Sequence, residues 1–587
     1  MDIQRWEVVL ALTAALTAHQ GFRRYDTYYP SVHAVLLLGP PVVAALIVSS
    51  WSDAPSEGIL PALRRIFPTY LFYLGLSIIL YRLSPLHPLA RYPGPYLRRV
   101  SHVVSACIAA PGNRCRRFDA LRLKYGDVIR TGPNEVLITD PSLIPALLGT
   151  SGSPKGPSWI GGLLSYKNMP MVGIPDTEEH LRRRRAWNRG LGPVALREYE
   201  GIVAERARQL AARLEEQQGE VSLGQWVNYF GRVHLSYDVM SDMAFGGGSE
   251  LLRDGDRNNV WSVIDDGMRV ASFLGHIPWL SVYLGHIPGA AGPLNKLLAS
   301  GWDFAGKRIA RGSHTRDLFH YLNNEDLPDK EPPPVRQLID DGILAVVAGS
   351  DTTSVALTST FYCILTNPAV HTTLLAEIDK YYPPGEDASV TAHHRNMPYL
   401  QAVIDEALRL YPPVPGGGER RVPHDAASVV VGSLLLPPGT AYWIPPWCLH
   451  RDPRNFSFPL SFWPERWLIA SGQLRFEDAR FPSSPSLDLT PNSSSTACDF
   501  TGREKRSDAK ANFVHNDGAY IPFSYGPMNC PGKGLAMLEM RTVVCALLQR
   551  FEMRLREGWD AASFERGYKD YFSATRPELP VTLHPRW

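Results

Sequence analysis

Cysteine is scarce in this sequence, with 7 among 587 residues. The cysteines are Cys107, Cys115, Cys363, Cys448, Cys498, Cys530 and Cys545. Their scattered positions show neither the close pairs of a zinc finger nor an even set of partners for a disulfide framework. A disulfide-stapled secreted scaffold and a cysteine-rich zinc domain are therefore excluded, and a reducing compartment is favoured.

Net charge is also low, because 60 basic side chains are balanced by 58 acidic ones and leave +2. That balance argues against a nucleic-acid-binding protein, whose surface is strongly basic. The sequence has no internal repeat, and no glycine-rich dinucleotide fingerprint lies between a predicted strand and a predicted helix.

The apolar and charged fractions, 44% and 20%, are ordinary for a globular protein. By length alone the chain is long enough for several domains. The motifs described below nevertheless depend on one another, so we expect one catalytic domain over residues 96–587. A polar insertion at about residues 471–507 holds too few apolar residues to offset the entropy of ordering it.

The first ninety residues contain three apolar stretches, at about Trp6–Ala18, Val32–Ser50 and Phe67–Tyr81. Only the second approaches the length of ~20 residues that spans a bilayer. The first carries Glu7 and the third is short, so each is either interfacial or spanning. The start of the chain has little positive excess, which argues against a cleavable signal peptide. We predict a membrane anchor over residues 1–82 with up to three transmembrane segments.

Arginines follow the last apolar stretch and a proline-rich connector comes after it. Arg82, Arg91, Arg98 and Arg99 place the downstream domain in the cytoplasm by the positive-inside tendency. Residues 83–95 are rich in proline and predict a stiff, turn-rich hinge. The glycosylation sequons at Asn455 and Asn492 are then expected to stay unmodified, because they face the wrong side of the membrane.

Hydrophobic patterning in the large domain predicts a mainly α fold with small β-sheets. Residues 126–140 alternate around a Gly-Pro-Asn turn, which is typical of two short strands. Helical patterns dominate afterwards, and residues 429–440 return briefly to strand and turn.

One cysteine, Cys530, lies at a position where its thiolate could bind a metal. Residues 523–532 read Phe-Ser-Tyr-Gly-Pro-Met-Asn-Cys-Pro-Gly and lead into an apolar helical run. A helix N-terminus offers free N–H groups and partial positive charge, which lower the pKa of a thiol and stabilise its anion. The glycines let backbone amides approach the sulfur of Cys530. Taken alone, a cysteine before a helix is more often a buried apolar residue.

The spacing Phe-x-x-Gly-x-x-x-Cys-x-Gly resembles the haem-binding loop of the cytochrome P450 monooxygenases. The resemblance implies the fold of that family, with haem b bound by Phe523, Gly526, Cys530 and Gly532 and the thiolate of Cys530 as axial ligand of the iron. The family usually has a basic residue two positions before the cysteine, where this chain has Met528. Other cations must then balance the haem propionates.

A long apolar helix is predicted over residues 341–357, interrupted by Gly349 and adjacent threonines. Such an interruption marks either a place where a ligand approaches and helical bonding loosens, or a packing contact with another helix. The segment resembles the oxygen-activating helix of the same family. The resemblance implies that Thr352 hydrogen-bonds the oxygen at the iron and that Asp351 relays protons from water, so both are candidate catalytic residues.

Glu406 and Arg409 lie three residues apart on a predicted helix. A pair of this kind usually lies on a solvent-exposed face, where it stabilises the helix by only roughly 0.2–0.5 kcal/mol. In the family that the chain resembles, a second arginine, here Arg466, joins such a pair. We therefore assign Glu406, Arg409 and Arg466 a structural role as a buried cluster that supports the cysteine loop.

A dense basic run at residues 179–189 is by composition a solvated or nucleic-acid-facing helix. The low net charge argues against nucleic acid. By resemblance, His180 and Arg184 lie one helical turn apart on the helix that contacts the haem propionates. Arg420 matches a further propionate-binding arginine, since a guanidinium binds a carboxylate in bidentate fashion.

The resemblance implies a membrane-anchored monooxygenase that splits dioxygen and inserts one oxygen atom into a lipophilic small molecule. Electrons would come from NADPH through NADPH–cytochrome P450 reductase, for which remaining arginines and Lys533 offer a cationic face. The residues of the cysteine loop, together with the anchor of several segments, most resemble fungal microsomal members of the cytochrome P450 family. Endoplasmic reticulum membrane, secondary metabolism and a terpenoid-like substrate are the expectations that follow, the last by fold-level analogy.

Two alternatives remain at this stage. One is a haem-thiolate isomerase or dehydratase that needs no external electrons, against which Asp351 and Thr352 argue. The other is a non-catalytic, membrane-tethered scaffold in which Cys530 is merely buried.

Overall fold

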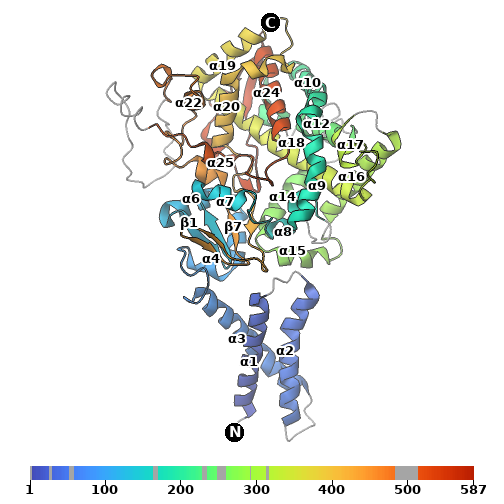
Figure 1. Ribbon diagram of the computed structural model, residues 1–587, viewed down its shortest axis with the longest axis vertical. Coiled ribbons are helices and arrows are strands. Elements are labelled where there is room, and N and C mark those ends of the chain that lie inside the picture. Colours follow the sequence, from blue (N-terminus) through green and yellow to red (C-terminus); the bar gives the residue numbers. More distant parts are fainter. Residues whose placement is uncertain are drawn as a thin grey trace.

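Three long helices at the amino end stand apart from a large helix-rich domain (Figure 1). The computed structural model describes residues 3–24, 29–51, 59–162, 169–217, 219–227, 235–247, 260–290, 292–312, 316–482 and 513–586. Most of the polar insertion predicted at about residues 471–507 lies outside these described residues.

The amino-terminal helices are α1 (Ile3–Arg24), α2 (Pro30–Trp51) and α3 (Ile59–Leu83). Small side chains such as Ala11, Ala15 and Ala45 are fully buried where the three helices meet. Large apolar side chains face outward instead, and Val35 and Phe72 are 67% and 64% exposed. α2 and α3 are long and apolar enough to cross a membrane, with mean hydropathies of 2.1 and 1.5.

The third apolar stretch was predicted to be short, at Phe67–Tyr81. The helix that contains it, α3, is 25 residues long because it begins eight residues earlier, at Ile59, and continues to Leu83. The predicted hinge at residues 83–95 packs on the large domain. The Tyr92 hydroxyl donates to the Leu435 carbonyl at 2.8 Å, and the Arg130 amide donates to the Pro93 carbonyl at 2.7 Å.

The large domain is mainly helical. Its helices are α4 (Tyr96–Val100), α5 (His102–Ala109), α6 (Arg114–Tyr125), α7 (Ile144–Leu148), α8 (Ser158–Gly161), α9 (Thr177–Gly190), α10 (Pro193–Glu215), α11 (Leu223–Val227), α12 (Leu235–Phe245), α14 (Val260–Gly275), α15 (Pro278–Gly285), α16 (Gly292–Arg311), α17 (Leu318–Leu322), α18 (Val335–Leu365), α19 (Pro368–Tyr381), α20 (Pro398–Leu410), α21 (Pro446–His450), α22 (Glu465–Ala470), α24 (Lys533–Arg550) and α25 (Ala562–Gly567).

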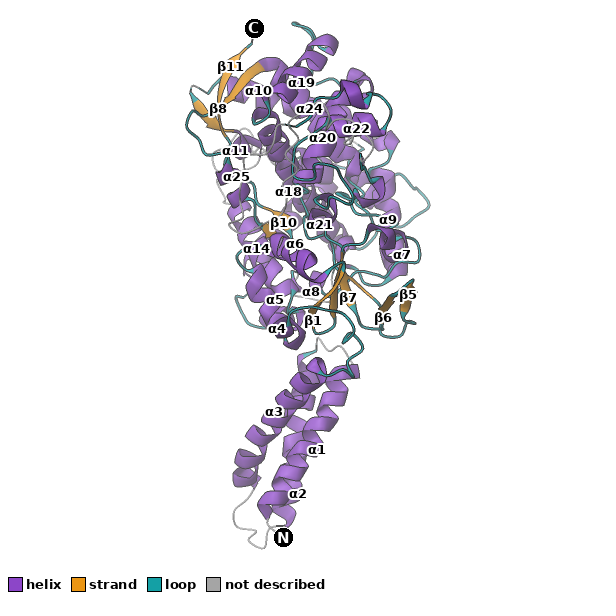
Figure 2. Cartoon of the chain, turned by 90° about the vertical axis from the view of Figure 1, so that its left-hand side faces the viewer, coloured by secondary structure: helices purple, strands orange, loops and turns teal. Residues whose placement is uncertain are grey.

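The strands are short and form small separate sheets (Figure 2). They are β1 (Val128–Gly132), β2 (Glu135–Ile138), β3 (Glu220–Ser222), β4 (Arg420–Arg421), β5 (Val429–Val431), β6 (Leu434–Leu436), β7 (Ala441–Trp443), β8 (Phe551–Leu555), β9 (Asp570–Tyr571), β10 (Ser573–Ala574) and β11 (Pro580–Pro585). The largest sheet has the order β1-β2-β7-β4, in which β2 and β7 are parallel and the other pairs antiparallel. The predicted mainly α fold with small β-sheets is confirmed.

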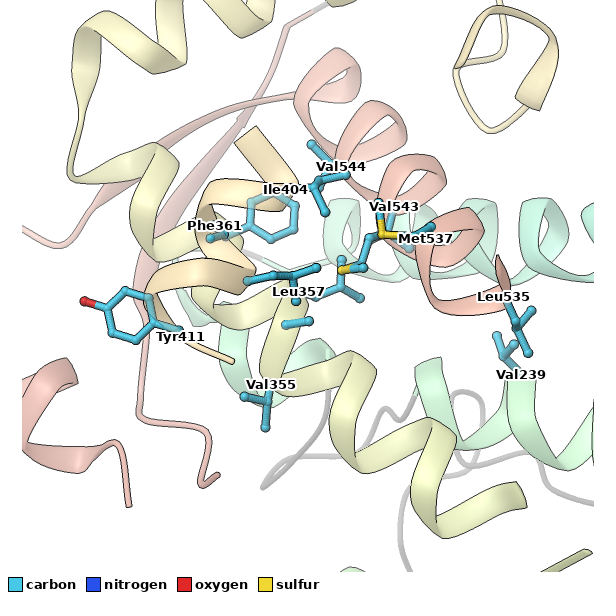
Figure 3. Packing of buried hydrophobic residues seen from close by; sticks show 14 of the residues in the cluster. Val239, Val355, Leu357, Phe361, Ile404, Tyr411, Leu535, Met537, Val543 and Val544 are labelled. Carbon is cyan, nitrogen blue, oxygen red and sulfur yellow. The ribbon is translucent and has the colours of Figure 1, made fainter. Parts of the chain in front are cut away.

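Helix α18 is the centre of the domain core, and α12, α16, α20 and α24 pack against it. Figure 3 shows Leu357 and Phe361 of α18 beside Ile404 of α20 and Val543 of α24, all of them buried. A Cβ atom at Gly349 would lie 2.5 Å from the sulfur of Met240 in α12. The structure therefore supports the packing interpretation of Gly349, which lets α12 approach α18 closely.

Candidate functional site

The loop at residues 523–532 is folded tightly against its neighbours. The Cys530 amide donates to the Phe523 carbonyl at 2.9 Å, and the Asn529 amide donates to the Gly526 carbonyl at 3.1 Å. Gly526 has a φ of +73°, and a Cβ atom there would collide with the Leu148 carbonyl oxygen. Glycine is thus required at position 526 by both backbone conformation and space.

The Cys530 side chain is solvent-accessible in the absence of a ligand, although protein surrounds it on most sides. This confinement raises the pKa of its thiol, while the amides of Gly532 and Lys533 and the cations Arg184 and Lys155 act in the opposite direction. The lowered pKa predicted from the helix N-terminus is therefore not found in the ligand-free protein. A metal bound to the sulfur reverses the balance, because a coordinating thiol loses its proton outright.

Thr352 occupies an accessible position in the middle of α18, next to a stretch of buried residues. Between Ser350 and Ile364 it is the one residue that is not fully buried, and Ala348, one turn earlier on the same face, is exposed. The Thr352 hydroxyl donates to the Ala348 carbonyl at 2.7 Å. This face of α18 has room beside it for a ligand.

Asp351 points to a different partner from Thr352. Its carboxylate is 5% exposed and forms an ion pair with Arg576, a residue of the segment between β10 and β11. The same guanidinium donates at 2.7 Å to Asp265 of α14. Nothing in the sequence pattern indicated Arg576 or Asp265, because they lie 225 and 86 residues from Asp351 in the chain.

His180 is buried on α9 and has one unused nitrogen. Its Nδ1 lies 2.9 Å from the Met171 carbonyl oxygen, which only accepts, so Nδ1 carries the hydrogen. Its Nε2 is buried and has no hydrogen-bond partner among the described residues. Burial and the neighbouring cation Lys155 lower the pKa of His180 to about 4, so in the ligand-free protein the ring is neutral at neutral pH.

Arg184 and Arg420 are distant from each other in the sequence, and both contact the cysteine loop. Arg184 donates to the backbone oxygen of Asn529 at 2.5 Å and to its side-chain oxygen at 2.7 Å. Arg420, on β4, donates to the sulfur of Met528 at 2.6 Å and is 3% exposed. The structure thus brings both predicted arginines to the two residues that precede Cys530.

Lys155 is a further cation at this place that sequence reasoning missed. It is buried and forms an isolated antiparallel bridge with Arg420. Burial and the charges of Arg420 and Arg184 lower the pKa of its ammonium group well below the ordinary value, and only Cys530 acts against them. The sequence offered no signal beyond a lysine in a Pro-Lys-Gly turn.

The predicted cluster of Glu406, Arg409 and Arg466 exists, and all three side chains have no exposed area. Arg409 binds the Glu406 carboxylate at 2.8 and 2.9 Å, and Arg466 binds it at 3.0 Å. The Trp463 amide and the Trp467 indole donate to it as well. Burial raises the pKa of Glu406, but the charges of Arg409 and Arg466 outweigh burial and lower it to about 2.

His450 connects this cluster to the cysteine loop. Its Nδ1 donates to the Arg409 carbonyl at 3.0 Å, and its Nε2 accepts the Ile521 amide at 3.0 Å, two residues before Phe523. Arg409 in turn donates to the His450 carbonyl at 2.6 Å. Burial lowers the pKa of His450 to about 3, which keeps the ring neutral and able to accept at Nε2.

These residues fit a haem group. Haem brings iron that takes an axial protein ligand, for which a cysteine thiolate is one of the known choices, and it brings two propionate carboxylates that need donors. The loop offers one thiol, while Lys155, Arg184 and Arg420 form no ion pair with any carboxylate in the described part of the chain and His180 has an unused Nε2. Among the described residues no group of three or more His, Cys, Asp or Glu side chains is arranged to hold a bare metal ion.

Comparisons with known proteins agree with this arrangement. The family model described as Cytochrome P450 matches residues 108–567. Over 523 residues the chain is 32% identical to cytochrome P450 monooxygenase FCK2 of Fusarium pseudograminearum, covering 87% of this chain and 84% of that protein. It is 30% identical to the trichothecene C-15 hydroxylase of Fusarium sporotrichioides, covering 87% and 95% of the two chains.

A third relative and a solved structure extend the comparison. Tryprostatin B 6-hydroxylase of Neosartorya fischeri is 30% identical, with 88% of this chain and 86% of that protein covered. The crystal structure of the cytochrome P450DA heme domain superposes with a TM-score of 0.62 at 17% identity, covering 81% of this chain and 94% of that one. At this identity the structural likeness shows the fold alone.

We expect Glu406→Gln to lower the free energy of unfolding by about 3–5 kcal/mol, because it leaves two buried guanidinium groups without their carboxylate. The pKa of Glu406 is lower in the folded than in the unfolded chain. Its contribution is therefore complete above about pH 4.3 and declines as the pH falls through the folded value. Urea unfolding of the detergent-solubilised protein at neutral and acidic pH measures both effects.

The matched control is Asp478→Asn, which breaks an exposed pair with Arg475 and is expected to change stability immeasurably. Equal stability of Glu406→Gln and the unmodified protein would contradict the structural role of the cluster.

Proposed function

Since the chain belongs to the cytochrome P450 family, we propose that it is a membrane-anchored monooxygenase that hydroxylates or otherwise oxidises a lipophilic small molecule. The observation that carries this proposal is the thiol of Cys530, held in a glycine-bounded loop near the cations Arg184 and Lys155, which have no carboxylate partner within the described ranges. Relatives named as hydroxylases of tryprostatin B and of trichothecene at C-15 support a hydroxylating reaction. We infer a role in fungal secondary metabolism, with a terpenoid-like or similar scaffold as substrate.

Haem, when bound, supplies the iron at which dioxygen is activated, and its thiolate ligand favours cleavage of the O–O bond. Cys530 would be that ligand. The amide groups of Gly532 and Lys533 direct partial positive charge at the sulfur and limit its basicity. Phe523 accepts the Cys530 amide through its carbonyl, and Gly526 keeps the loop against Leu148, so the sulfur is held in one position.

Thr352 and Asp351 are proposed to deliver protons at the accessible face of α18. The Thr352 hydroxyl is positioned there by its bond to the Ala348 carbonyl and can exchange that bond for one to a ligand. Asp351 lies beside it and is held as an anion by Arg576. Because a relay group must take up a proton, Asp351 acts only when Arg576 shifts its guanidinium toward Asp265.

Electrons are proposed to come from NADPH through NADPH–cytochrome P450 reductase. A surface cavity of about 350 Å³ lies beside the cysteine loop and is lined by Phe523, Ser524, Lys533 and Arg541 among others. Lys533 is exposed at the start of α24, three residues from Cys530. Exposed cations at this short distance from the thiol suit an acidic electron-donor protein.

The amino-terminal bundle is proposed to anchor the protein in the endoplasmic reticulum membrane. Large apolar side chains such as Val35 and Phe72 face outward while Glu7 and His19 are buried inside, the reverse of a water-soluble bundle. Glu7 of α1 is 6% exposed and accepts three hydrogen bonds, at 2.8 to 3.1 Å, from the Arg65 guanidinium of α3. His19 of α1 contacts the Ser77 hydroxyl at 3.1 Å.

We infer that α1 also spans the bilayer, as a third segment. Its only carboxylate, that of Glu7, is paired with Arg65 inside the bundle, so the outward surface of the helix carries no acidic group. Arg23, Arg24 and Arg82 lie at the bundle end nearest the large domain, while the N-terminus lies at the far end (Figure 1). The positive-inside tendency then puts the domain in the cytosol and the N-terminus in the lumen.

The bundle also touches the large domain at a place that suits membrane contact. His33 of α2 lies 2.9 Å from the Tyr283 hydroxyl of α15, and the two rings stack. Trp279 of the same helix is 44% exposed. Indole rings favour the bilayer interface, so α15 is proposed to rest on the membrane surface, from which a lipophilic substrate enters.

The proposal is tested by Cys530→Ser. The reduced protein under carbon monoxide is expected to show the strongly red-shifted absorption band of thiolate-ligated haem, and the variant to lose that band and its turnover. Cys107→Ser, the same change at an exposed cysteine, is expected to keep both. A wild-type protein without the band would favour a scaffold, and turnover without NADPH and reductase would favour an isomerase or dehydratase.

Asp351→Asn is expected to lower turnover by about a hundredfold, because a positioned acid is lost while size and hydrogen bonding to Arg576 are kept. Fewer oxygenated products should form per NADPH consumed, and the solvent deuterium isotope effect should rise. Asp340→Asn, on the same helix and paired with Arg336, is the matched control. Unchanged coupling and isotope effect in Asp351→Asn would exclude the relay.

The three-span anchor predicts glycosylation of an N-terminal extension that carries a sequon and is long enough to clear the bilayer. The same extension at the C-terminus should stay unmodified, as should the native sequons at Asn455 and Asn492. An endoglycosidase-sensitive shift in mass, measured in a eukaryotic expression host, reports the result. An unmodified N-terminal extension would mean that α1 does not cross the membrane.

A further inference from the structure

The cysteine loop lacks a positive charge at position 528, where Met528 stands. Its side chain is 8% exposed and its sulfur accepts a hydrogen bond from Arg420 at 2.6 Å. A thioether orients the guanidinium in this way but adds no charge. The cations that face an anion here must therefore come from elements outside the loop.

His180 does not supply the missing charge by itself. In the ligand-free protein its ring is neutral, and the nitrogen left free, Nε2, carries a lone pair because Nδ1 holds the hydrogen. A neutral His180 therefore presents an acceptor, not a donor, to a carboxylate. Arg184 and Arg420 are the two predicted residues that remain charged.

Lys155 is held rigidly beside Arg420 by backbone hydrogen bonds on both sides. The Arg421 amide donates to the Pro154 carbonyl at 3.1 Å, and the Gly156 amide donates to the Glu419 carbonyl at 3.0 Å. The lysine is 9% exposed, and its ammonium group lies 5.2 Å from the centre of the Trp159 ring. Its backbone position is thus fixed by the strand that also carries Arg420.

The ammonium group of Lys155 has no carboxylate partner and donates no hydrogen bond among the described residues. Two arginines and the lysine lie near Cys530 with no carboxylate among the described residues to balance them, and burial and the two arginine charges lower the pKa of the Lys155 ammonium group well below its ordinary value. A buried charge that stays unpaired costs several kcal/mol. Such an arrangement is stable when a ligand with negative groups occupies the space between the cations, and two propionates are such groups.

We propose that Lys155 binds a haem propionate together with Arg420 and so replaces the positive charge that Met528 does not provide. The inference rests on the proposed haem-dependent function and adds a residue to its cofactor site. It also explains how a loop with a neutral residue at position 528 retains haem. The charge would come from a segment that is bridged to β4 and not from the loop itself.

The test measures haem loss from the full-length protein in detergent, by transfer to excess apomyoglobin. Lys155→Met is expected to release haem about tenfold faster or more, as expected for loss of one charge-assisted contact. Adding Met528→Arg to that variant is expected to restore retention to within about threefold of the unmodified protein. Lys155→Arg should retain haem as the unmodified protein does.

Lys330→Met makes the same change at an exposed lysine and should leave haem loss unchanged. Circular dichroism of each variant excludes misfolding as the cause of faster loss, and rescue by Met528→Arg excludes it independently. Equal rates for Lys155→Met and the unmodified protein, or no rescue by Met528→Arg, would overturn this inference alone. An unmodified protein without the thiolate-type carbon monoxide band would overturn the proposed function as well.

Discussion

The carboxylate of Glu406 is the contact on which the rest of the site depends. It is fully buried and holds two guanidinium groups, an amide and an indole, so its hydrogen-bonding capacity is used completely. Arg409 also donates a hydrogen bond to the His450 carbonyl, and the His450 ring accepts one from the Ile521 amide just before the cysteine loop. The position of the Cys530 sulfur is therefore set by charges outside its own loop, and losing one of them leaves the others buried without a partner.

A second constraint is the unbalanced charge around that sulfur. Confinement raises the pKa of the Cys530 thiol, and burial lowers the pKa of Lys155. The protein surroundings alone therefore disfavour the charged form of each group. A group that brings a cation for the sulfur and anions for the neighbouring lysine and arginines relieves both at once. Iron at the centre of a porphyrin with propionates at its edge has this distribution of charge. The ligand-free site is thus electrostatically complementary to haem.

Local sequence patterns predicted the helices, the small sheets and the glycine-bounded loop, because these depend on neighbouring residues, whereas the Glu406 cluster was predicted from the resemblance to a known family. Three contacts escaped prediction: the link through His450, the cation Lys155, and the bridge from Arg576 to Asp351. Each joins segments distant in sequence, and neither spacing nor composition reveals which arginine will meet which carboxylate. The lowered pKa expected for Cys530 failed for a related reason, since the helix N-terminus was visible in the sequence and the confinement of the thiol was not.

The anchor and the large domain obey the same physics with different solvents. In the domain, large apolar side chains such as Phe361 fill the interior, because water surrounds it. In the bundle, alanines lie beside Ile66 and Tyr70 in the interior and many large apolar side chains face outward, an arrangement that suits apolar surroundings. The carboxylate of Glu7 lowers the mean hydropathy of α1. This carboxylate is nevertheless buried in the bundle, where it accepts hydrogen bonds from the Arg65 guanidinium. A helix is therefore judged as a membrane span by the groups it presents outward as well as by its length, and α2 and α3 are the described helices that are long and apolar enough to cross a membrane.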